Sequence, residues 1–255
     1  MLASWSWKSR LQAAGLHFGL CLVIAALAGL LVFGLWYPYP YRDISGGREL
    51  FFIVVSVDVI LGPLITLVIF NRDKKWVELR MDLLVVVVIQ LAALGYGLWT
   101  VFVARPVHLV FEYDRFRVVH ALEVPPSMMD SLPANLQALP LLGPTLLSLR
   151  PFKNDEESVE ATLQALKGLS LSARPDLWQP YEAARAEILR EARPVVKLKQ
   201  RFAAQTAQID RAASSAGRKA DDLVYLPMVG RKTFWTVLLD PVTAQPLAFL
   251  PLDSF

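Results

Sequence analysis

LFFIVVSVDVILGPLITLVIF, residues 50–70, is the stretch of sequence that decides the fold. It is apolar apart from one acid, Asp58, and two small hydroxyl side chains. A helix of about 20 apolar residues is long enough to cross the hydrocarbon core of a bilayer. Asp58 lies near its middle, where a carboxyl group costs roughly 2.5–3.5 kcal/mol to insert. Pro63 has no N–H, so the carbonyl of Val59 loses its helical donor. We therefore expect this region to face other protein rather than lipid.

Two further stretches have the same character. Residues 15–36 are apolar, with His17 as their only side chain among His, Lys, Arg, Asp and Glu, and they end in an aromatic cluster typical of a membrane interface. This run is too long for a signal peptide and lacks a small-residue cleavage site, so we interpret it as a retained helix. Residues 83–103 are again apolar. The sequence thus predicts a membrane domain over 1–104, with transmembrane helices at about 15–36, 50–70 and 83–103.

The basic residues predict the orientation of these helices. The N-terminus and the loop 71–82 together carry six Lys and Arg, whereas the loop 38–49 and Arg105 carry three. Because cytoplasmic loops are enriched in Lys and Arg, the N-terminus and the loop 71–82 are expected to be cytoplasmic. Three spans then place residues 105–255 on the other side, which in a bacterium is the periplasm.

Depth along the helices suggests partners for Asp58. Tyr96 lies at nearly the same depth, so we predict a Tyr96–Asp58 hydrogen bond, with the deeper Gln90 as the alternative. Together with Gly62 and Pro63, these residues form a candidate site with three interpretations. They lock the helix bundle, they dock another membrane helix, or Asp58 takes part in an ion or proton relay, which usually needs more titratable groups.

Residues 105–255 are predicted to form a soluble α+β domain, long enough for its own core. Residues 107–124 alternate in polarity and predict a hairpin with its turn at Asp114-Arg115, in which Glu112 lies opposite Arg117. Asp-Arg is not a favoured two-residue turn, so a bulge or a one-residue slip stays open. A short strand is expected within residues 146–152, and further antiparallel strands at 223–230, 233–240 and 246–252.

About three helices are expected between these strands. Asn154 is a predicted N-cap for the first, which ends at Gly168 and has an apolar stripe of Val159, Leu163 and Leu166. The second is expected from about 180 to 193 and the third from about 197 to 216.

The sequence contains no catalytic, cofactor-binding or metal-ligating pattern: no G-x-S-x-G, P-loop, G-x-G-x-x-G or H-E-x-x-H is present. Residues 105–255 hold 18 Lys and Arg against 17 Asp and Glu, so nucleic acid is not an expected partner. The single cysteine, Cys21, lies in an apolar run and excludes an intrachain disulfide. We therefore expect a protein that is not an enzyme and that needs no cofactor.

Five stretches resemble the type IV pilin accessory proteins, the TfpX/TfpZ-like family. They are WYPYPY (36–41), VDVILGPLITLVIFN (57–71), ARPVHLVFEYDRFRVV (104–119), LPMVGR (226–231) and WTVLLDPVTAQPLAFLPLD (235–253). The resemblance implies a multi-pass inner-membrane protein that assists pilin stability or pilus assembly and has no enzymatic residues. The implied partners are the major type IV pilin, other pilus assembly proteins and the lipid bilayer.

Two other functional classes stay open at this point. A periplasmic ligand-sensing protein or a membrane-anchored scaffold of the pilus machinery would have the same architecture, although short loops leave no cytoplasmic output domain. A membrane enzyme would need a second acid or histidine within reach of Asp58.

Overall fold

The computed structural model describes residues 7–70 and 75–255. The chain divides into two compact units, which are described separately. The first comprises the chain up to Pro38 together with Gly47–Val103, and the second comprises Tyr39–Gly46 together with Ala104–Phe255. Two of the basic residues used to predict the orientation, Arg72 and Lys74, lie outside the described residues.

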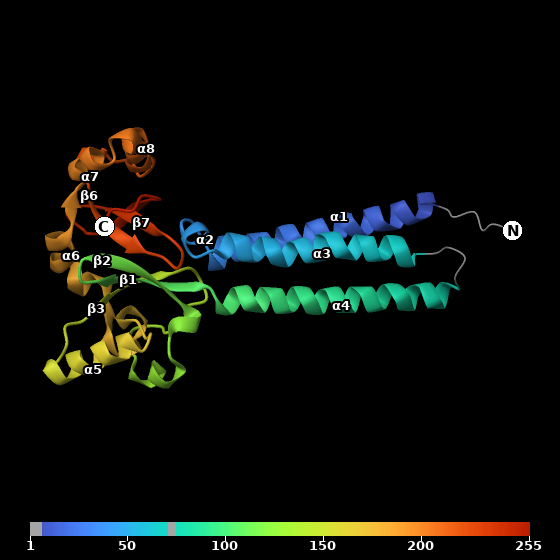
Figure 1. Ribbon diagram of the computed structural model, residues 1–255, viewed down its shortest axis with the longest axis horizontal. Helices are drawn as coiled ribbons and strands as arrows, with labels where there is room; N and C mark the ends of the chain where they lie inside the picture. The colour runs from blue at the N-terminus through green and yellow to red at the C-terminus, as the bar shows by residue number, and fades with distance from the viewer. Residues whose placement is uncertain (1–6, 71–74) are drawn as a thin grey trace. The chain divides into compact units, whose positions relative to one another are not determined.

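The first unit consists of three long helices, each long and apolar enough to cross a membrane, as predicted. They are α1 (Trp7–Leu31), which continues into the π-helical turn η1 (Val32–Trp36), α3 (Gly47–Ile69) and α4 (Trp76–Val103). α3 packs against both α1 and α4 (Figure 1). The helices begin before the predicted spans, because polar residues at their ends continue the helix beyond the apolar stretch. Pro63 lies inside α3, and the helix continues through it.

The second unit is built on one eight-stranded sheet. Its strands are β1 (Pro106–Glu112), β2 (Arg115–His120), β3 (Thr145–Leu149), β4 (Trp178–Pro180), β5 (Arg193–Pro194), β6 (Val224–Val229), β7 (Phe234–Leu239) and β8 (Pro246–Leu250). They lie in the order β4-β3-β1-β2-β6-β7-β8, and β5 pairs with β6. The sheet is mixed, because β1 pairs with β3 and β2 with β6 in parallel. The sequence predicted antiparallel strands and did not indicate these two pairs.

Helices and short turns connect the strands (Figure 1). The α-helices are α2 (Tyr41–Ile44), α5 (Asp155–Leu166), α6 (Arg185–Glu191), α7 (Val195–Arg201) and α8 (Thr206–Ser215). The 3-10 turns are η2 (Ala121–Glu123), η3 (Pro126–Ser131), η4 (Leu171–Ala173), η5 (Pro175–Leu177), η6 (Tyr181–Ala184), η7 (Ala203–Gln205) and η8 (Ala220–Asp222). The third predicted helix is divided into α7, η7 and α8, because Phe202 leaves the helical region with φ −117° and ψ 54°.

The β1–β2 hairpin corrects one prediction. Glu112 pairs with Arg115, so the turn lies at Tyr113-Asp114, one residue before the predicted position. Tyr113 has a φ of 59°, which suits the first central position of a tight hairpin turn. The predicted pairing of Glu112 with Arg117 is therefore wrong: Arg117 lies opposite Val110, and the Glu112 carboxylate accepts a hydrogen bond from Ser172 Oγ.

The core of the second unit covers both faces of the sheet. One cluster joins Leu109, Phe111, Phe116 and Val118, which were predicted to share a face, to Tyr181 and Ile188 of η6 and α6. The opposite face carries Val110, Val119 and Trp178. A third cluster packs α7 and α8 against the sheet near β8.

The connection between the first two long helices belongs to the second unit. Tyr41 and Ile44 are buried in the same core cluster as β1 and β2. The ring of Tyr39 contacts that of Trp235, with centroids 6.2 Å apart. The sequence predicts this segment to be part of the membrane domain, since nothing in its composition indicates the surface against which it packs.

Candidate helix-docking site

One stripe of α3 faces the neighbouring helices. Phe51, Val55, Asp58, Gly62 and Thr66 are buried or half-buried, whereas most residues between them are exposed. The spacing of three or four residues places them on one side of the helix. Asp58 is therefore directed toward the other two helices, and it lies at the centre of α3, whose ends are Gly47 and Ile69.

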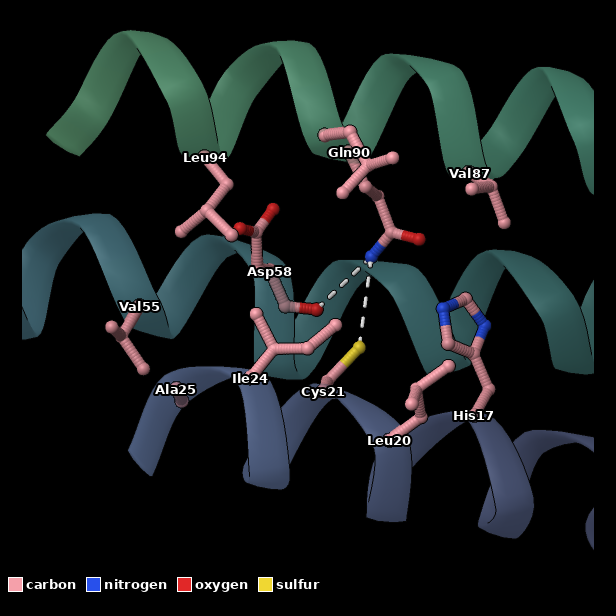
Figure 2. Close-up of a pocket in the computed structure, with 11 residues that line it drawn as sticks. His17, Leu20, Cys21, Ile24, Ala25, Val55, Asp58, Val87, Gln90 and Leu94 are labelled. Carbon is pink, nitrogen blue, oxygen red and sulfur yellow. Dashed lines mark hydrogen bonds between the residues drawn. The ribbon is translucent and has the colours of Figure 1, made fainter. Parts of the chain in front are cut away.

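Gln90 of α4 connects all three helices. Its Nε2 donates to the main-chain oxygen of Asp58 on α3 at 3.3 Å and contacts Sγ of Cys21 on α1 at 3.9 Å (Figure 2). The amide reaches this position because residue 62 is glycine: a Cβ at Gly62 would overlap the Gln90 amide. The small residue and the amide thus form one contact, typical of helix packing within a membrane.

The structure has no hydrogen bond between Tyr96 and Asp58, and the alternative partner, Gln90, bonds only the main-chain oxygen of Asp58. The Tyr96 side chain is 75% exposed. Tyr96 lies six residues after Gln90, which corresponds to about 120° around a helix of 3.6 residues per turn. The prediction compared depth along the helices and neglected this rotation.

A cavity of about 60 Å³ lies between the three helices beside these residues (Figure 2). Its lining is mostly apolar, with four exceptions: His17, Cys21, Asp58 and Gln90. His17 and Cys21 were not among the residues that the sequence predicted for this site. Their spacing of four residues, which places both on one face of a helix, was the available signal.

The carboxylate of Asp58 is directed away from the Gln90 amide (Figure 2). Within residues 7–70 and 75–255, no hydrogen bond or ion pair to this carboxylate occurs. The contact to Gln90 uses only the main-chain oxygen of Asp58. The side chain is thus available to a group that enters the cavity.

His17 is engaged elsewhere in the bundle. Its Nδ1 lies 2.6 Å from Oγ1 of Thr66, two helical turns beyond Asp58 on α3. Two turns closer to the N-terminus, Arg10 donates from Nη1 to the main-chain oxygens of Leu67 and Val68, at 3.4 and 3.2 Å. These contacts hold the beginning of α1 against the last turn of α3.

The arrangement suits recognition of a helix better than metal chemistry. In the described part of the chain, no group of three or more His, Cys, Asp or Glu side chains could hold a metal ion. What the site does offer is an apolar hollow, one carboxylate and one amide at the middle of a membrane-spanning bundle. A polar side chain on another membrane helix could bond there, and its apolar residues could fill the remainder.

The two units define a class: a membrane protein whose three spanning helices precede an α+β domain. A family model described as fimbrial assembly protein FimB matches residues 5–46. The fimbrial assembly proteins of serogroups I and E1 from Dichelobacter nodosus are each 35% identical to this chain, over 234 and 235 residues. Each match covers 90% of both chains. A shorter relative, from serogroups C1 and C2, is 40% identical over 122 residues, which is 48% of this chain and 91% of its own.

The chain belongs to the family of fimbrial assembly proteins. The resemblance to type IV pilus accessory proteins is thereby confirmed. No solved structure matches the chain.

Proposed function

We propose that this protein assists the assembly of type IV pili at the bacterial inner membrane by holding pilin subunits. The three-helix unit contacts the membrane helix of the pilin at the Asp58 cavity, and the periplasmic α+β domain contacts its soluble head. The protein holds the subunits by non-covalent contacts and catalyses no reaction. The relatives are named for fimbrial assembly, which supports the process but not this mechanism.

The observation that carries the proposal is the Asp58 carboxylate, which lies beside a cavity at the centre of α3 and has no hydrogen bond or ion pair to any described residue. A carboxyl group at this depth is costly in lipid, and a group without an internal partner contributes nothing to locking the bundle. Bundle locking is better explained by Gln90, which does contact the neighbouring helices. The side chain of Asp58 is therefore assigned to docking.

Site-specific photocrosslinking in the native host tests the proposal. Leu91 lines the cavity, whereas Ile89, on the same helix and equally open, does not. A photoreactive residue at 91 should crosslink to the major pilin, and one at 89 should not. Equal crosslinking at both positions, or capture of a different membrane protein at 91, would contradict pilin docking at this cavity.

Substitution of Asp58 separates docking from stability. Asp58→Asn and Asp58→Ala should reduce surface piliation several-fold while the protein level stays normal, because the carboxylate has no partner among the described residues of the bundle. Piliation is measured by shearing and immunoblotting. If both variants assemble pili normally, Asp58 has no docking role. If both lose the protein itself, Asp58 is structural.

A further inference from the structure

Helix α5 of the second unit exposes its apolar side to solvent and turns a mostly polar side toward the domain. Its apolar side chains Val159, Leu163 and Leu166 form one stripe and are 59%, 52% and 80% exposed. The side directed toward the protein carries Glu157, Ser158, Ala161 and Gln164, of which only Ala161 is fully buried. A surface helix of a globular protein normally buries its apolar stripe. The stripe was recognised in the sequence, but its outward direction was not.

Strong local contacts fix α5 in this orientation. Asn154 caps its N-terminus by accepting from the N–H of Glu157 at 2.9 Å. Arg150 donates from both Nη atoms to the Glu157 carboxylate, at 2.9 and 2.6 Å. At the other end Gly168, with a φ of 98°, lets Leu169 N–H bond to the oxygen of Gln164 at 3.0 Å. Rotation of the helix to bury its stripe would break the Arg150–Glu157 pair.

The stripe lies beside negatively charged side chains, of which Glu160 interacts electrostatically with Arg174. Asp155, Glu156 and Glu160 line a shallow groove together with Val159 and Leu163. Among the residues that the structure describes, no cation forms an ion pair with these three carboxylates. A partner with an apolar face and cationic side chains would complement this part of the surface. An anionic lipid surface would be repelled, and pairing of two copies through α5 would bring like charges together.

We propose that this face of α5 is the surface by which the α+β domain binds a segment of pilin that carries an apolar face flanked by Lys or Arg. Leu163 lies at the centre of the stripe, and the three carboxylates meet the flanking cations. The inference rests on the proposed function and identifies the part of the domain that contacts the pilin head. Exposed side chains make this docking face without contributing to the domain's own core.

Photocrosslinking from Leu163 in the native host tests this surface. With a photoreactive residue at 163, a crosslink to the major pilin is expected, and its yield should fall at least fivefold when Glu156→Lys and Glu160→Lys are added. The matched control is Leu122→Gln, which removes another exposed apolar side chain, 62% exposed, from the same domain. It should leave the yield unchanged. Neither change should alter the protein level or the melting temperature, since all these side chains are exposed.

The other outcomes are also decisive. Pilin crosslinking at Leu91 of the cavity but not at Leu163 would overturn this inference and leave the proposed function standing. Absence of pilin crosslinks at both positions would overturn both. A crosslink at 163 that the charge reversal does not weaken, or one to a second copy of this chain, would reject a cationic segment of pilin as the occupant.

Discussion

At Gln90, one amide group connects α4 to both α3 and α1, and the absence of a side chain at residue 62 makes the room for it. Neither residue is informative alone, because a glycine in a membrane helix and a glutamine near its middle each have many explanations. Their contact explains why both are present. It also separates two roles within the site: Gln90 and Gly62 form a contact between the helices, and the proposed function assigns the Asp58 side chain to a partner.

The Gly62–Gln90 contact predicts a coupling between two substitutions. Gly62→Ala should destabilise the bundle by about 1–3 kcal/mol, because the new methyl group overlaps the Gln90 amide. Gln90→Ala should cost about 1 kcal/mol through its lost hydrogen bonds. The double variant should cost less than the sum, since removal of the amide makes room for the methyl group. Thermal unfolding of the detergent-solubilised protein measures all three.

Gly95→Ala is the matched control, because a Cβ at Gly95 meets nothing within 4 Å. It should be neutral. Additive costs for Gly62→Ala and Gln90→Ala would show that the two residues do not share a contact.

His108 makes the second unit sensitive to acid. The ring is fully buried, with Nδ1 2.7 Å from Thr145 Oγ1 and Nε2 2.9 Å from the Ala138 oxygen. Burial lowers the pKa of His108 to about 4, against an opposing effect of the Ala138 oxygen. In the unfolded chain the pKa is about 6.5, so between these two values the unfolded state binds more protons.

Stability should therefore fall as the pH drops from about 6.5 to about 4, by up to about 3 kcal/mol. His108→Gln should remove most of this dependence, because glutamine does not titrate. The free energy of unfolding is measured at several pH values for both proteins. Parallel pH profiles would show that another group causes the acid sensitivity.

At the scale of the element, α5 shows how local contacts override a hydrophobic pattern. Its boundaries follow from the sequence, since Asn154 caps it and Gly168 follows its end, as predicted. Its orientation depends instead on Arg150, which lies before the helix and pairs with Glu157. A hydrophobic stripe indicates which residues share one face of a helix, but it does not establish that this face is buried against the rest of the protein.

This pair gives the element-scale prediction. The bond from Arg150, followed by that from the Lys153 N–H, lowers the pKa of Glu157 to about 2. Glu157→Gln should destabilise the protein by about 1 kcal/mol at pH 7. Because the pKa is lowered on folding, this contribution is present above about pH 4.5 and is lost as the pH falls toward 2. Chemical denaturation at pH 7 and pH 3 tests both statements.

The neighbouring Glu156, which forms no ion pair in the described residues, supplies the control. Glu156→Gln should be neutral at both pH values. If the two glutamine variants behave alike, the Arg150–Glu157 pair does not hold α5.

At the scale of the whole molecule, the basic residues determine the expected arrangement in the membrane. The basic residues predict a cytoplasmic N-terminus and a periplasmic α+β domain. The segment Tyr39–Gly46 packs into the α+β unit, which is consistent with both lying on one side of the membrane. This topology is required by the proposed function, since the head of a pilin waiting for assembly is periplasmic.

Cysteine labelling of spheroplasts tests the topology. In a Cys21→Ser background, Val242→Cys on the α+β unit should react with a membrane-impermeant maleimide in intact spheroplasts. Lys75→Cys, which precedes α4, should react only after permeabilisation, because it is expected to be cytoplasmic. The reverse pattern would contradict the predicted orientation and remove the basis for contact with a periplasmic pilin head.

The sequence by itself determined the features that depend on local composition: three apolar helices, the limits of α5, the shared face of Leu109, Phe111, Phe116 and Val118, and the family. Apolar length, capping residues and alternation act between near neighbours, so they can be recognised along a chain.

The tertiary structure alone decided what depends on helix rotation, strand partners and distant contacts. Gln90, and not Tyr96, contacts Asp58, and His17 and Cys21 line the cavity. β1 pairs with β3 and β2 with β6 in parallel, and the apolar stripe of α5 is exposed. The physical reason is common to all four. A side chain's depth and polarity are properties of its own segment, whereas the group it meets is set by how separate segments pack together.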